Sequence, residues 1–118
     1  MNKKELEKRL VDFVVVVTKL TTEQNKNVTI LHLNDQAIRS STSCALNYGE
    51  AQSAVSKKDF IHKISIVLKE LRETYINLTI IKRLNEGIDL EEFNAILKEN
   101  DELLAIFHKT IQTARKNG

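Results

Sequence analysis

The sequence predicts an all-α fold, an antiparallel up-down-up-down bundle of four helices that spans residues 1–118 as a single domain. Proline is absent and glycine occurs three times in 118 residues, and these two residue types most disfavour helix interiors. Apolar residues recur at spacings of three and four over four long segments, which is the period of a helix that buries one face. The connecting stretches are short, so neighbouring helices are expected to run antiparallel.

The composition is that of a small globular protein. Hydrophobic residues make up 42% of the chain and charged residues 29%, a balance typical of a folded domain. The net charge of +2 neither supports nor excludes a phosphate-rich partner. With one cysteine, Cys44, the chain has no internal disulfide and no cysteine-rich metal site. We therefore expect a cytoplasmic protein.

The first helix is predicted over residues 3–22. Its core face comprises Leu6, Leu10, Phe13, Val14, Val17 and Leu20. The β-branched run 13–17 could also form a buried strand, but the helical period continues well past strand length on both sides. The run is too short to span a bilayer, and the flanking Asp12 and Lys19 disfavour a signal peptide, so no membrane partner is expected. Val11 and Val15 lie on a different face.

The second helix is predicted over residues 27–51. Its apolar stripe, much of it small, comprises Ile30, Leu33, Ala37, Ser41, Cys44, Ala45 and Tyr48. Small side chains let a neighbouring helix approach closely, so this helix is expected in a crowded position. The opposite face is polar and comprises His32, Gln36, Arg39, Ser43, Asn47 and Glu50.

The third helix is predicted over residues 57–85. Ser56 followed by Asp59 is a capping-box pattern for its start, and Gly87 is expected to end it in a left-handed conformation. Its core stripe comprises Phe60, Ile64, Val67, Leu68, Leu71, Tyr75 and Leu78.

The fourth helix is predicted over residues 90–115, after a second capping pattern at Asp89 and Glu92. Its stripe comprises Leu90, Phe93, Ile96, Leu97, Leu103, Leu104, Phe107 and Ile111. Asn100 falls inside this stripe, where a polar residue more often sets helix register than performs chemistry.

The sequence contains no pattern that indicates an enzyme, a cofactor or a small-molecule substrate. His32, His62 and His108 are far apart, and the Glu-x-x-His pattern of bundle metal sites is absent. The nearest match is Asp59 three residues before His62, but it occurs once and near a helix end. Cys44 lies on an apolar face, so we interpret it as a buried small hydrophobe.

The polar face of the second helix is expected to contact another part of the protein or another subunit. Arg39 and Glu50 lie about 16 Å apart along the helix axis, so they cannot pair with each other, and each needs a partner on another helix or another subunit. The alternative is that both face water. Since Val11 and Val15 also lie outside the core, we favour a subunit interface. Its candidate residues are Val11, Val15, Gln36, Arg39, Ser43, Asn47 and Glu50.

A positively charged stripe on the third helix is a candidate for contact with nucleic-acid phosphates. It comprises Lys58, His62, Lys69 and Arg72, with Ser65 among them. The alternative, which we favour, is a solvated face that Glu70 and Glu73 partly neutralise.

Residues 36–51, 56–60 and 66–74 together resemble the four-helix-bundle family of proteins encoded in 23S rRNA intervening sequences. The matching positions are Gln36, Arg39, Asn47, Glu50, Leu68, Glu70 and Leu71. The chain departs from the family pattern at Ala51, where many members have glycine after the glutamate; here a glycine occurs earlier, as Gly49.

This resemblance implies a homo-oligomer, commonly a five-membered ring, whose biochemical role is mostly unassigned. A related branch comprises the accessory proteins of diversity-generating retroelements, in which a basic ring works with a reverse transcriptase and nucleic acid. The near-neutral charge of this chain fits a strongly basic ring poorly. We therefore predict a non-enzymatic homo-oligomeric scaffold. The alternative is a nucleic-acid-binding accessory protein for structured RNA or a DNA/RNA hybrid.

Overall fold

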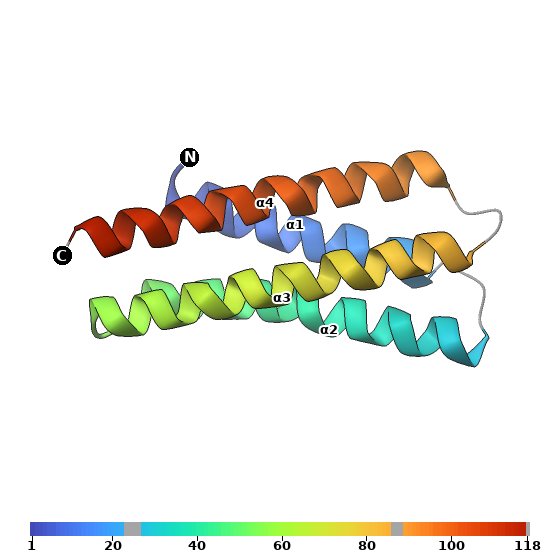
Figure 1. Ribbon diagram of the computed structural model, residues 1–118, viewed down its shortest axis with the longest axis horizontal. Coiled ribbons are helices and arrows are strands. Elements are labelled where there is room, and N and C mark those ends of the chain that lie inside the picture. The colour runs from blue at the N-terminus through green and yellow to red at the C-terminus, as the bar shows by residue number, and fades with distance from the viewer. Residues whose placement is uncertain (23–26, 86–88, 118) are drawn as a thin grey trace.

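Four helices in up-down-up-down order form the bundle in the computed structural model, which describes residues 1–22, 27–85 and 89–117 (Figure 1). They are α1 (Lys3–Thr22), α2 (Val28–Gln52), α3 (Lys57–Leu84) and α4 (Leu90–Lys116). The predicted fold class is confirmed, and each helix begins and ends within one residue of its predicted range. No helix in the described part of the chain is long and apolar enough to cross a membrane.

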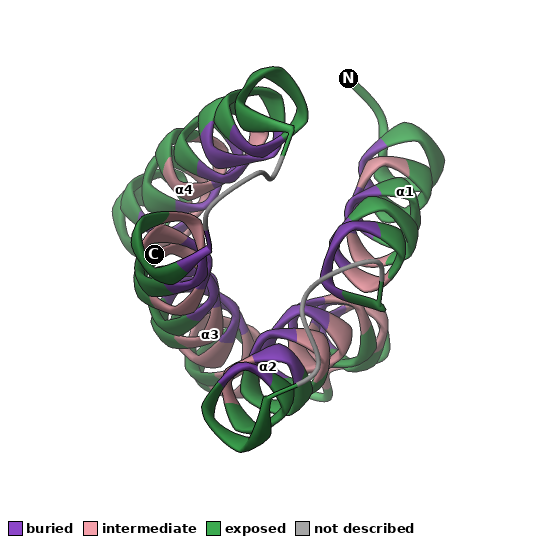
Figure 2. Cartoon of the chain, turned by 90° about the vertical axis from the view of Figure 1, so that its right-hand side faces the viewer, coloured by how far each residue is buried: buried purple, intermediate pink, exposed green. Residues whose placement is uncertain are grey.

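The core consists of the inward faces of all four helices (Figure 2). Most residues of the four predicted stripes are buried, and Leu33, Ala45, Phe60, Tyr75 and Leu104 are partly buried against them. The prediction that Leu90 belongs to the core is wrong, because its side chain is 55% exposed. It is the first residue of α4, one turn before Phe93, where burial of this helix begins.

Helix ends confirm two of the predicted caps and add a third. The Ser56 hydroxyl accepts a hydrogen bond from the Asp59 N–H at 3.0 Å, and the Asp89 carboxylate accepts one from the Glu92 N–H at 3.2 Å. The Asn27 side chain, which was not predicted as a cap, accepts a hydrogen bond from the Ile30 N–H and caps the start of α2. Gly87, the predicted end of the third helix, lies outside the described residues. The departure at Ala51 does not end α2, which continues to Gln52.

Buried polar contacts at three places set the helices relative to one another. Asn34 Nδ2 donates to the Thr21 carbonyl at 2.8 Å and joins α2 to the end of α1. The hydroxyls of Ser40 and Thr74 lie 2.6 Å apart between α2 and α3. Asn100 is fully buried in α4, as predicted. In the amide orientation that satisfies its nitrogen and its oxygen, Asn100 donates a hydrogen bond to the Leu71 carbonyl of α3 at 3.0 Å. Its oxygen accepts one from the Tyr75 N–H of α3 at 3.2 Å.

Candidate interaction surfaces

The polar face of α2 lies beside α3 and forms one wall of an open groove of about 590 Å³. Its lining residues are Gln36, Arg39, Ser40 and Ser43 from α2, and Glu70, Glu73, Ile76 and Asn77 from α3. Three of the predicted interface residues therefore come together in this groove. The Ser40–Thr74 contact at its base fixes the level at which the two helices meet.

Polar residues of α2 find partners within the chain, and one of these corrects an expectation. Arg39 Nε lies 2.9 Å from Asp35 Oδ2, one turn earlier in the same helix, so the expectation of a partner on another helix or subunit is wrong for Arg39. Side chains four residues apart share a helix face, which explains this pairing. Glu50 does pair with another helix, through Lys63 Nζ of α3 at 3.7 Å. Asn47 Nδ2 donates to the Ser43 hydroxyl at 3.0 Å.

The α3 wall of the groove is acidic. Burial raises the pKa of Glu70 above its ordinary value, and the negative charge of Glu73 raises it further, whereas Lys69 acts in the opposite direction. Within the part of the chain that the structure describes, neither carboxylate forms an ion pair. The α3 wall therefore carries two carboxylates with which no cationic side chain of the described residues forms an ion pair.

Val11 and Val15 of α1 lie on a different surface from this groove. Their side chains are 48% and 44% exposed, as expected for residues outside the core. Helix α1 lies beside α2 and α4, and its backbone does not approach that of α3 in the described residues, because α1 lies diagonally across the bundle from α3 (Figure 2). The predicted interface residues thus divide between two surfaces of the molecule.

A second exposed apolar pair, which the sequence interpretation did not single out, lies on α3 at the edge of the groove. Ile76 is 58% exposed and Ile80 is 38% exposed. The sequence did carry a signal for them: both fall outside the predicted core stripe of α3, just as Val11 and Val15 fall outside that of α1.

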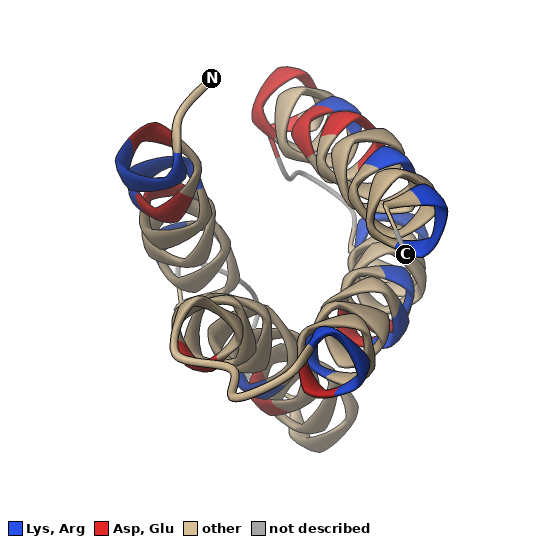
Figure 3. Cartoon of the chain, turned by 90° about the vertical axis from the view of Figure 1, so that its left-hand side faces the viewer, with Lys and Arg blue, Asp and Glu red and all other residues tan. Residues whose placement is uncertain are grey.

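The predicted basic stripe is exposed and extends from α3 to α4. Lys58, His62, Lys69 and Arg72 are all exposed on α3. Arg72 Nη2 donates to His108 Nε2 of α4 at 3.2 Å. Figure 3 shows Lys and Arg residues on the outer sides of both helices. The carboxylates of Glu70 and Glu73 line the groove toward α2 instead, so Arg72 and the two acidic residues face different neighbouring helices.

Cys44 is fully buried, which confirms its interpretation as a small hydrophobe. Burial raises the pKa of its thiol, and Sγ donates to the Ser40 carbonyl at 3.2 Å. Because the reactive form of cysteine is the thiolate, this side chain is unsuited to nucleophilic chemistry. Among the described residues no cluster of three or more potential metal ligands occurs.

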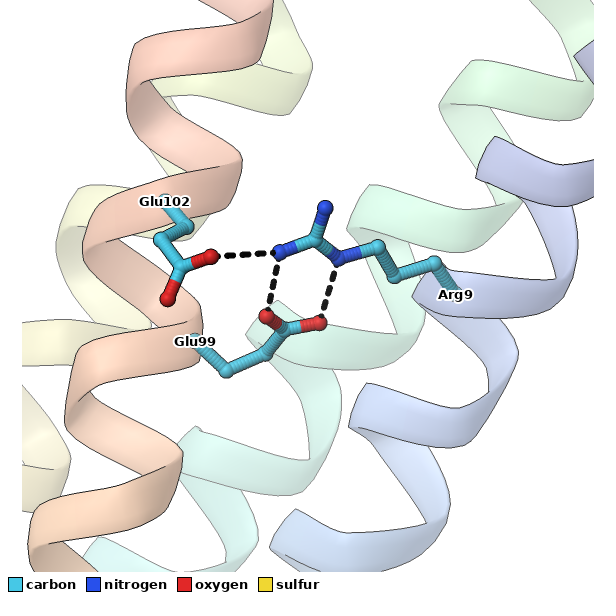
Figure 4. Close-up of polar contacts among 3 residues, drawn as sticks. All are labelled: Arg9, Glu99 and Glu102. Carbon is cyan, nitrogen blue, oxygen red and sulfur yellow. Dashed lines mark hydrogen bonds and ion pairs between the residues drawn. The ribbon is translucent and has the colours of Figure 1, made fainter. Parts of the chain in front are cut away.

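An ion-pair cluster that the sequence interpretation missed joins α1 to α4 (Figure 4). Arg9 binds Glu99 with two hydrogen bonds, of 2.7 Å from Nε and 2.6 Å from Nη2, and its Nη2 also donates to Glu102 at 3.1 Å. The hydrogen bond to Glu99 raises the pKa of Arg9 above its ordinary value. No local pattern could reveal a contact between residues 90 positions apart in the chain.

Next to this cluster, a groove of about 440 Å³ lies between α1 and α4. Its walls are mainly apolar, with Phe13, Val16 and Leu20 on one side and Ala95 and Ile96 on the other. Glu99, which binds Arg9, also lines this groove, so the ion-pair cluster lies at its edge.

Comparison with known proteins agrees with this architecture. The sequence profile of the family described as 23S rRNA-intervening sequence protein matches residues 3–109. The chain is also similar to a crystal structure of a protein with unknown function from the S23 ribosomal protein family of Bacteroides thetaiotaomicron VPI-5482. That similarity has 30% sequence identity and a TM-score of 0.82, and covers 95% of this chain and 99% of the other. No curated protein matches the sequence. The chain therefore belongs to the family of 23S rRNA-intervening sequence proteins.

Proposed function

We propose that the protein is a non-enzymatic scaffold that assembles from several copies of this bundle. The observation that carries the proposal is the pair of exposed apolar surfaces, Val11 with Val15 on α1 and Ile76 with Ile80 on α3. Both lie on helices whose opposite faces already fill the core. Grouped apolar residues on a surface, rimmed by polar ones, are typical of protein interaction sites.

The polar residues near these surfaces suit the rim of an interface. The carboxylates of Glu70 and Glu73 lack an ion-pair partner in the described part of the chain, so a neighbouring copy could supply one. A rim of charged groups around an apolar centre gives an interface its specificity more than its affinity. The family resemblance adds the expectation of a five-membered ring.

Light scattering coupled to size exclusion, at micromolar protein, tests the assembly. The expected mass is a multiple of the 13.5 kDa chain, five times that value for the ring. A mass of a single chain across this concentration range would refute the proposal.

A second candidate function, binding of structured RNA or a DNA/RNA hybrid, is favoured by the hydrogen bond between Arg72 and His108. This contact extends the basic stripe over two helices, and a ring would repeat the stripe once in each copy. An accessory role beside a reverse transcriptase would follow from the resemblance to the retroelement branch.

Binding through this stripe should weaken steeply as salt rises, because phosphate contacts release counterions. The double variant Lys69→Glu/Arg72→Glu should lose affinity for both kinds of nucleic acid and flatten the salt dependence. A matched variant, Lys3→Glu/Lys19→Glu, makes the same change of charge on α1 and should retain more of the binding. Equal affinities for the two variants would exclude the stripe as the site.

A further inference from the structure

We infer that two different surfaces meet in this assembly, with α1 of one copy packed along α3 of the next. The α1 ridge consists of Lys8, Val11 and Val15, and the α3 ridge of Glu73, Ile76 and Ile80. This inference rests on the proposed homo-oligomer and names the contact that would build it.

The two ridges have the same spacing. In each, a charged residue is followed by an apolar residue three positions later and by a second apolar residue four positions after that. Positions at these separations lie on one face of a helix. When the two helices run parallel, Val11 therefore meets Ile76 and Val15 meets Ile80, at the level where Lys8 meets a carboxylate of opposite charge.

Charges around the ridges are complementary in this alignment. Lys8 is positive and its counterpart Glu73 is negative. Lys8 Nζ does bind Asp12 within its own helix at 2.8 Å, but both side chains are well exposed. Such exposed pairs contribute little free energy, so exchanging this partner costs little.

The same alignment also places Lys4 near Lys69, a like-charge pair at one end of the contact. Lys4 lies in the first turn of α1, and both side chains are exposed, so water and salt screen this repulsion. The two apolar pairs and the Lys8–Glu73 pair oppose it.

The direction of the helices fits a ring. In the up-down-up-down bundle α1 and α3 run the same way (Figure 1), and rotation about an axis along the bundle preserves that direction. A contact between two different surfaces is heterologous, and it builds a ring where the rotation between neighbouring copies closes and an open filament where it does not. A two-fold dimer would instead require one surface to meet its own copy.

The contact also sets a tilt. The Asn34–Thr21 and Ser40–Thr74 hydrogen bonds place Val11 at about the level of residue 70 within one copy. Its counterpart Ile76 lies about six residues farther along α3, or about 9 Å at the rise of a helix. The subunits must therefore tilt relative to the ring axis, as ridges of packed helices commonly do.

Two variants, each with one ridge broken, test the pairing. The α1-ridge variant is Val11→Glu/Val15→Glu, and the α3-ridge variant is Ile76→Glu/Ile80→Glu. All four positions are exposed and glutamate favours helix more than valine or isoleucine, so both variants should fold, as circular dichroism would verify. Alone, each variant should have the mass of a single chain. Mixed in equal amounts, they should form a 1:1 dimer that grows no further, because only one intact contact can form.

Charge exchange provides an independent check. Lys8→Glu alone and Glu73→Lys alone should each weaken assembly roughly tenfold, and the chain that carries both changes should recover most of the loss. The variant Val28→Glu/Val55→Glu changes two exposed apolar residues outside both ridges, one at the start of α2 and one in the connection between α2 and α3, and should assemble like the wild type.

The outcomes separate the two proposals. If the wild type is a monomer, both the scaffold and the pairing fail. If wild type and both ridge variants assemble equally, the scaffold stands and the pairing is overturned. Assembly of one ridge variant alone shows a contact between identical surfaces and also overturns it, as does a mixture that stays monomeric.

Discussion

Replacing Thr74 with valine tests whether a buried pair of hydroxyls holds α2 against α3. The Thr74 and Ser40 hydroxyls lie 2.6 Å apart, and both residues are buried. Valine retains the branched shape of threonine but removes the hydroxyl. A typical hydrogen bond contributes about 1 kcal/mol net to stability. Thr74→Val should therefore lower the free energy of unfolding by about 1 to 2 kcal/mol, since Ser40 keeps only a longer bond to the Ala37 carbonyl, at 3.3 Å.

A double-mutant cycle isolates this contact. Ser40→Ala should cost about 1 kcal/mol, and the double variant Ser40→Ala/Thr74→Val should cost less than the two single changes combined, by about 1 kcal/mol. Urea unfolding followed by circular dichroism measures these values, at one fixed protein concentration because assembly shifts apparent stability. Thr79→Val is the matched control, since the Thr79 hydroxyl bonds the Tyr75 carbonyl of its own helix. It should change stability by less than about 0.5 kcal/mol. Strict additivity of the two changes would refute the contact.

Three further changes test other parts of the bundle. Arg9→Gln should lower the free energy of unfolding by about 1 kcal/mol, and by less at high salt. Adding Glu99→Gln should lower it little further, because the ion pair is already broken. A second loss of equal size, measured by urea unfolding, would show that Arg9 and Glu99 act separately. Because the pKa of Glu70 is raised above its ordinary 4.5, the folded chain binds that proton more tightly than the unfolded chain does. Its stabilisation is full below pH 4.5 and is lost as pH rises through the raised value. Glu70→Gln should remove this part of the pH dependence, and an unchanged profile would contradict it. Phe107→Ala, at a fully buried position, should cost about 3 to 5 kcal/mol; a loss below about 1 kcal/mol would mean the site is not packed.

Helix positions could be predicted from the sequence because each amphipathic segment is long. Over 20 or more residues, the helical period averages out individual exceptions such as the β-branched run in α1. At the ends there is no such averaging. Leu90 fits the spacing of the core stripe of α4, but it is the first residue of the helix and none of the neighbouring residues that the structure describes covers it, so its side chain is exposed.

The surfaces could be predicted in part. Val11 and Val15 were identified because they fall outside the core stripe of α1, and the same criterion applied to Ile76 and Ile80 would have identified the α3 ridge. Partners across helices could not be predicted. Since charged side chains are long and several share each face, only the relative rotation and height of α1 and α4 decide that Arg9 meets Glu99.

Disulfide cross-linking tests the pairing of ridges most directly. A chain carrying both Val15→Cys and Ile80→Cys brings two thiols together across the inferred contact, while native Cys44 stays buried with a raised thiol pKa. Under mild oxidation this chain should form covalent multimers up to the full ring, and a non-reducing gel would resolve them. Either single-cysteine variant should remain uncross-linked. Dimers of the Val15→Cys variant alone, or a double variant that stays a single chain, would contradict the account.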